Sequence, residues 1–83
     1  MNMDFRTTEE EVTVRLRRWL KDCTVLFYYE PVDAEYVCIV YFYNFNLKYT
    51  TTIAYYKELD TKNIVHILLS DISSFITKKF FKD

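Results

Sequence analysis

The chain has 83 residues, of which 51% are hydrophobic, 19% are aromatic and 28% are charged, and its formal net charge at pH 7 is −1. This length is that of a single domain, the hydrophobic content excludes a disordered chain, and the net charge supplies no long-range attraction to nucleic acid or anionic lipid. Glycine is absent and proline occurs once, which also excludes phosphate-binding loops built on glycine.

The composition and the N-terminus indicate source and compartment. Phe, Tyr, Ile, Asn and Lys are abundant, as in an AT-rich coding sequence, which points to a low-GC bacterium, its phage or another virus. The opening residues, MNMDFRTTEEE, are polar and acidic where a secretory signal needs a basic start and an apolar run. We therefore expect a cytoplasmic protein with no membrane partner, located in the host cytoplasm if the source is a phage or virus.

The first predicted element is a helix that follows a flexible arm of residues 1–6. Thr8 and Glu11 form a capping-box pattern with Thr8 as the N-cap, and acids at the helix start suit the helix dipole. Apolar residues then recur at helical spacing: Val12, Leu16, Trp19, Leu20 and Cys23. Basic residues lie on the far side, and we favour a solvated helix face over a phosphate-binding patch: Arg17, Arg18 and Lys21.

Three strands are predicted next, over residues 24–29, about 35–43 and about 47–57, because these segments are rich in β-branched and aromatic residues. Pro31 lies in the turn after the first strand, since proline cannot donate to a ladder. The segment 44–46 predicts a three-residue hairpin loop with Asn46 in the left-handed conformation.

This loop sets a register in which Tyr43 faces Leu47 and Val37 faces Ile53. The odd-numbered residues of both strands then form the core face. The opposite, open face holds Tyr36, Val40, Phe42 and Tyr56, with part of Leu26 and Tyr28. A slip of one residue would exchange the two faces of one strand.

A second helix is predicted from about residue 62 to 79, with Asp60 or Thr61 as its N-cap. Its apolar face comprises Val65, Leu68, Leu69, Ile72, Phe75 and Ile76. The chain is therefore predicted to be one α+β domain over residues 1–83. Its expected order is α-β-β-β-α, with a three-stranded antiparallel meander and both helices packed on one face.

Double-stranded-RNA-binding domains share this element order, but the likeness ends there. Those domains use a basic N-terminus of the second helix and a loop that contains glycine. Here the second helix opens with Asp60-Thr61-Lys62-Asn63 and glycine is absent, so that family is not assigned.

Short connections align the two helices, so acids at helix starts and strand ends are expected to gather at one end of the sheet. Bases are expected at the other end. An acidic rim beside exposed aromatic residues suits docking on a basic groove of another protein. The predicted partner-binding residues are Glu30, Asp33, Glu35, Glu58, Asp60, Tyr36, Phe42 and Tyr56.

No catalytic, metal or cofactor site is predicted. His66 is the one histidine, and although Ser70 and Asp71 follow on the same helix, a serine–histidine–acid relay needs convergent geometry that this spacing does not give. Cys23 and Cys38 are expected to be buried free thiols, with a disulfide or a metal site as the alternative.

Three functional hypotheses follow. The favoured one is a non-enzymatic protein-binding module: a small phage or viral accessory protein that inhibits a host nucleic-acid enzyme or defence nuclease, as anti-CRISPR proteins do. The second is a single-stranded nucleic-acid-binding protein that uses open-face aromatics with Lys48 and the basic helix ends. The third is a structural homodimer whose interface is the aromatic face.

Overall fold

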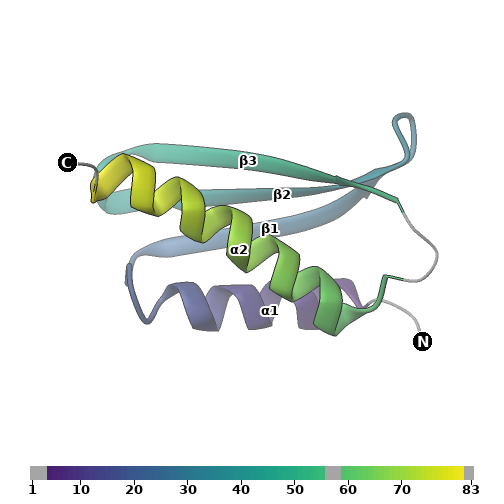
Figure 1. The fold of residues 1–83 in the computed structure, drawn as a ribbon, viewed down its shortest axis with the longest axis horizontal. Coiled ribbons are helices and arrows are strands. Elements are labelled where there is room, and N and C mark those ends of the chain that lie inside the picture. The colour runs from purple at the N-terminus through teal and green to yellow at the C-terminus, as the bar shows by residue number, and fades with distance from the viewer. Residues whose placement is uncertain (1–3, 56–58, 82–83) are drawn as a thin grey trace.

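The structure, a computed structural model, describes residues 4–55 and 59–81. Its elements are α1 (Phe5–Leu16), β1 (Cys23–Glu30), β2 (Glu35–Phe42), the short 3₁₀ helix η1 (Tyr43–Phe45), β3 (Leu47–Ala54) and α2 (Thr61–Phe80). The strands form an antiparallel sheet in the order β1-β2-β3. Both helices lie on the same side of this sheet and contact each other (Figure 1). The predicted α+β fold is confirmed.

The helices run in the same direction. Both begin at the end of the sheet that holds the β1–β2 turn and finish at the end that holds the β2–β3 turn (Figure 1). In the described part of the chain, neither helix has the length and apolar character needed to cross a membrane.

Helix α1 begins earlier than the capping-box pattern predicts. Its N-cap is Asp4, whose side chain accepts a hydrogen bond from the backbone N–H of Thr7, and this bond lowers the pKa of Asp4. Phe5 packs on Phe27 and Tyr36, which draws the start of the helix onto the sheet. The prediction of Thr8 as N-cap is therefore wrong, and residues 5 and 6 of the expected arm are helical; residues 1–3 lie outside the described residues.

The end of α1 also differs from the prediction. The helix ends at Leu16, and the backbone N–H groups of Trp19 and Leu20 both bond to the carbonyl of Leu16 in the turn that follows. Cys23 is the first residue of β1 rather than part of the helical stripe, and Trp19 is 58% exposed. The helical periodicity of the sequence thus continues past the physical end of the helix.

The register of β2 against β3 is shifted by one residue from the prediction. Phe42 pairs with Leu47 and Tyr36 pairs with Ile53. Asn46 is left-handed as predicted, with φ of 50°, but the hairpin loop has four residues because Tyr43 belongs to η1. The extra residue turns the even-numbered side chains of β2 toward the helices.

The core lies between the sheet and the two helices. Its β2 residues are Tyr36, Cys38, Val40 and Phe42, which are between 0% and 6% exposed. The expected exposure of Tyr36 and Phe42 is therefore wrong: Tyr36 is 6% exposed and Phe42 is 1% exposed.

Helix α2 agrees closely with the prediction. Asp60 is its N-cap and accepts a hydrogen bond from the N–H of Asn63 at 2.9 Å. Its buried residues are Ile64, Val65, Leu68, Ile72 and Ile76.

Candidate protein-interaction surface

The face of the sheet opposite the helices carries an apolar strip that we call the open-face patch: Leu26, Tyr28, Val37, Ile39 and Tyr41. In the ladder, Leu26 pairs with Ile39 and Tyr28 pairs with Val37. Leu26 and Tyr28 are 44% and 40% exposed, whereas Val37 is only 7% exposed and Ile39 and Tyr41 are half-buried. The sequence indicated these two residues, but it missed Ile39 and Tyr41 because the predicted register placed them in the core.

The β1–β2 turn adds three carboxylates to one end of this face, and we call them the acidic turn: Glu30, Asp33 and Glu35. Glu30 and Glu35 stand directly opposite each other in the β1–β2 ladder, where like charges destabilise an antiparallel pair. Among the described residues, neither recorded ion pair involves any of the three. The carboxylate of Glu30 instead accepts a hydrogen bond from the backbone N–H of Val32 at 2.7 Å.

The backbone of this turn is strained. Ala34 has φ of 51°, in the left-handed region that costs a residue with a β-carbon roughly 1–2 kcal/mol. The carbonyl of Ala34 accepts a hydrogen bond from the N–H of Tyr55 at 3.0 Å, which holds the turn against β3. The adjacent Val32 is 87% exposed. The turn thus presents its carboxylates and one apolar side chain on a fixed backbone.

The other predicted acids have structural partners. Asp60 caps α2, and Glu9 accepts a hydrogen bond from the backbone N–H of Phe27 at 2.8 Å. Glu10 and Glu11 form exposed ion pairs with Arg6 and Arg15 within α1. Glu58 and Tyr56, two further predicted partner-binding residues, lie outside the described residues. These other described acids are therefore tied to α1 or α2, whereas those of the acidic turn lie at the β1–β2 connection.

An aromatic cluster lies beside the acidic turn, on the helix side of the sheet. The ring of Tyr36 is central, with its centroid between 5.7 and 5.9 Å from those of Phe5, Phe27, Tyr29 and Tyr55. Tyr29 and Tyr55 are 38% and 46% exposed. Tyr36 therefore supports exposed aromatic residues at the acidic end without being exposed itself.

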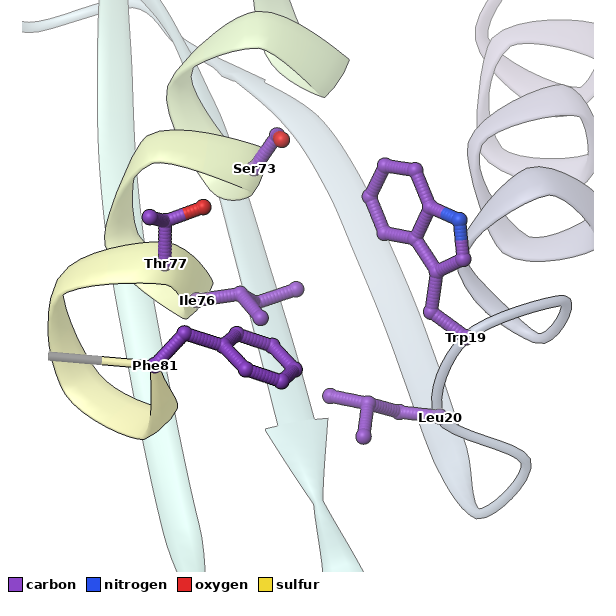
Figure 2. Close-up of a pocket in the computed structure, with 6 residues that line it drawn as sticks. All are labelled: Trp19, Leu20, Ser73, Ile76, Thr77 and Phe81. Carbon is purple, nitrogen blue, oxygen red and sulfur yellow. The ribbon is translucent and has the colours of Figure 1, made fainter.

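The opposite end of the molecule holds most of the bases and an apolar groove of about 390 Å³ between the turn after α1 and the end of α2. Its lining comprises Trp19, Leu20, Ser73, Ile76, Thr77 and Phe81. Figure 2 shows the indole of Trp19 on one side and the side chains of α2 on the other, with Phe81 and Leu20 approaching each other across the groove. None of these lining residues is charged, so the groove has the character of an apolar binding surface.

Asp71 and His66, which were considered for catalysis, both lie on α2. Asp71 accepts a hydrogen bond from the hydroxyl of Tyr49 at 2.8 Å, and His66 is exposed. Within residues 4–55 and 59–81, no group of His, Cys, Asp and Glu side chains has the geometry of a metal site. Cys23 and Cys38 are buried free thiols, as predicted, and burial raises the pKa of both.

Fold and surface together define an α+β domain with an open sheet face and an acidic turn. Comparison of the chain with protein-family models, with curated proteins and with solved structures found no match.

Proposed function

We propose that this chain is a non-enzymatic protein-binding module that docks on a basic surface of another protein through the acidic turn and the open-face patch. The observation that carries the proposal is the position of Glu30 directly opposite Glu35. Such a pair costs stability in the free chain, and a cationic partner would remove that cost. The apolar area beside it, with Leu26 44% exposed, would supply the buried centre of an interface.

The class of partner follows from the same chemistry. A fixed group of carboxylates beside aromatic and aliphatic side chains complements a groove that normally holds the phosphate backbone of nucleic acid. We therefore propose that the partner is a host nucleic-acid enzyme or defence nuclease, and that the chain is a phage or viral accessory protein that inhibits it. Complementary charge would speed the encounter, and the apolar patch would slow dissociation.

The test is a pull-down with tagged protein from lysate of the source cell, with and without nuclease, read by mass spectrometry. The acidic turn is reversed in one variant, Glu30→Lys/Asp33→Lys/Glu35→Lys. The matched control, Glu10→Lys/Glu11→Lys/Asp22→Lys, changes the net charge by the same amount at exposed sites elsewhere. Circular dichroism verifies that both variants fold.

The expected result is a nuclease-resistant protein retained by the wild-type chain and by the control but lost with the acidic-turn variant. Added duplex DNA or RNA should also displace the chain from that partner. Retention of the same partner by the acidic-turn variant would overturn the proposal.

A second candidate function rests on the basic end of the open face. The rings of Tyr41 and Tyr43 are stacked with centroids 6.4 Å apart, and Tyr43 is 60% exposed. Lys48 is exposed and pairs with Tyr41 in the β2–β3 ladder. Exposed aromatic rings beside a lysine suit base stacking on single-stranded nucleic acid. Fluorescence anisotropy with a labelled oligonucleotide at low salt tests this: binding lost in Tyr43→Ala/Lys48→Ala would support it, and no binding by the wild type would remove it.

A further inference from the structure

The two edge strands of the sheet, β1 and β3, differ in whether side chains bond to their outward backbone groups. At the edge of β1, two outward backbone groups are occupied by side chains. Glu9 of α1 accepts a hydrogen bond from the N–H of Phe27, and the guanidinium of Arg17, in the turn after α1, donates to the carbonyl of Cys23. These groups would otherwise be open to pairing with another strand. A carboxylate and a guanidinium thus protect part of this edge of the sheet.

Among residues 4–55 and 59–81, no such bond is recorded at the edge of β3. Because the N–H of Tyr55 donates to the carbonyl of Ala34 in continuation of the β2–β3 ladder, the odd-numbered residues of β3 exchange hydrogen bonds with β2. The even-numbered residues therefore turn their N–H and C=O groups outward: Lys48, Thr50, Thr52 and Ala54. Among the described residues, no side chain or backbone group from another element is recorded bonding to these outward groups.

Strand β3 also lacks the usual devices that prevent edge pairing. Its sequence, LKYTTTIA, contains no proline and a single charge, and its eight residues pair with β2 without a bulge. On the helix side, the inward residues of β2, and those of β1 other than Tyr29, are buried, whereas those of β3 are only half-buried: Leu47, Tyr49, Thr51 and Ile53. The cover provided by α2 therefore stops short of this edge.

We propose that β3 pairs antiparallel with β3 of a second copy of this chain, about a two-fold axis at Thr51, so that two three-stranded sheets become one continuous sheet. In this register Thr50 of each copy lies opposite Thr52 of the other, and Lys48 lies opposite Ala54. All the outward groups of one strand then meet those of the other. Threonine pairs across strands are favourable, and no like charges face each other.

The distribution of charge along the sheet favours a second copy of this chain as the partner of β3, and it also favours this register. Antiparallel pairing inverts the second molecule end for end, so its basic end lies beside the acidic end of the first. Glu35 is the ladder neighbour of Ala54, which places Lys48 of the second copy in the same row and on the same face as Glu35. Adjacent strands are about 4.8 Å apart, and the short Ala54 side chain leaves the path between lysine and glutamate open.

The experiment compares two variants that carry the same lysine. In Thr50→Lys/Thr52→Lys, two like-charged pairs face each other across the two-fold axis, whereas in Thr50→Lys/Thr52→Glu the facing side chains have opposite charge. All of these positions are exposed on the open face of the single chain, so both variants should fold. Sedimentation equilibrium between about 1 μM and about 1 mM measures the dissociation constant of each.

The wild-type mass should rise with concentration from 10.2 kDa toward twice that value. The lysine–lysine variant should dissociate at least about tenfold more readily than the lysine–glutamate variant. In amide hydrogen exchange, the N–H groups of Lys48, Thr50, Thr52 and Ala54 should gain protection as the dimer forms.

A monomer at every concentration would overturn the inference. So would a dimer with equal dissociation constants for the two variants, or one in which those amides stay unprotected, because either result puts the interface elsewhere. The inference would also be overturned if the chain stayed monomeric and its β3 edge paired with a strand of a different protein. Glu35 belongs both to the acidic turn and to the row that would hold Lys48 of the second copy. The two tests are nevertheless distinguishable, because the substitutions at Thr50 and Thr52 leave all three carboxylates of the acidic turn unchanged.

Discussion

The carboxylate of Glu9 on α1 accepts a hydrogen bond from the backbone N–H of Phe27 on β1, with Oε2 and N 2.8 Å apart. This bond joins the first helix to the outer edge of the sheet and occupies a donor that β2 cannot reach. The sequence indicated Glu9 only as an acid at a helix start. Its observed position gives it a different role, because it both anchors the helix and closes an edge.

Replacing Glu9 with alanine should therefore lower the free energy of unfolding by about 1–2 kcal/mol, the cost of leaving a partly buried N–H without its charged acceptor. Urea denaturation followed by circular dichroism measures this. Glu10→Ala is the matched control: it removes only an exposed ion pair with Arg6, for which we expect a loss below about 0.5 kcal/mol. Equal losses for the two variants would contradict the role assigned to Glu9.

Neighbouring residues of β2 test the observed register directly. Phe42 is 1% exposed and its ring packs on Phe75 with centroids 6.3 Å apart, whereas Tyr41 is half-buried on the open face. Phe42→Ala should cost about 3–5 kcal/mol through lost burial and a cavity. Tyr41→Ala should cost clearly less. The register predicted from the sequence requires the reverse order, so thermal denaturation of the two variants separates the registers.

The difference between these registers shows what sequence patterns could and could not determine. Helix α2 was predictable because Asp60 is a good N-cap and its apolar residues recur at helical spacing. Strand β2 was predictable as a strand, but residues 36–43 are apolar on both faces, so alternation gave no information about which face is buried. Its facing depended on the loop alone, and one additional loop residue reversed it.

The candidate surface was likewise predictable only in part: its acids could be placed from the sequence, but the residues whose facing depends on the β2 register could not. The carboxylates of the acidic turn lie in a short connection between strands, and the structure brings Glu30 and Glu35 together as the element order requires. The predicted exposure of aromatic residues beside them was wrong where it depended on the β2 register, as for Phe42. The edge contacts of Glu9 and Arg17 left no sequence signal, since only the packing of α1 on β1 brings them to the strand.

Trp19 should contribute little to stability despite its size. Its side chain is 58% exposed at the apolar groove, while Leu16, one turn earlier, is fully buried. Trp19→Ala should lower the free energy of unfolding by less than about 1 kcal/mol, against about 2–5 kcal/mol for Leu16→Ala. Chemical denaturation gives both values. A loss for Trp19→Ala as large as that for Leu16→Ala would mean that the groove is closed around the indole in solution.

The free energy of unfolding should fall in alkaline solution, because the folded chain keeps a buried thiol and two tyrosine hydroxyls protonated. Burial raises the pKa of Cys38 from its ordinary value of 9.0 to about 12, and the charges of Glu9 and Asp71 act in the same direction. Burial also raises the pKa of Tyr36 and Tyr49 above 10.0. The folded chain therefore binds these protons more tightly than the unfolded chain, and the resulting stabilisation is complete below pH 9 and is lost as the pH rises toward 12.

Urea unfolding at intervals of pH between about 8 and about 11 measures this loss, with each proton contributing about 1.4 kcal/mol per pH unit once the unfolded group ionises. Cys38→Ala should be less stable at pH 8 because of the lost sulfur, but its stability should decline less steeply with pH. An unchanged slope would show that the Cys38 thiol is not the titrating group. A thiol reagent such as Ellman's reagent should modify Cys38 only as the chain unfolds, because the reactive thiolate is suppressed in the folded core.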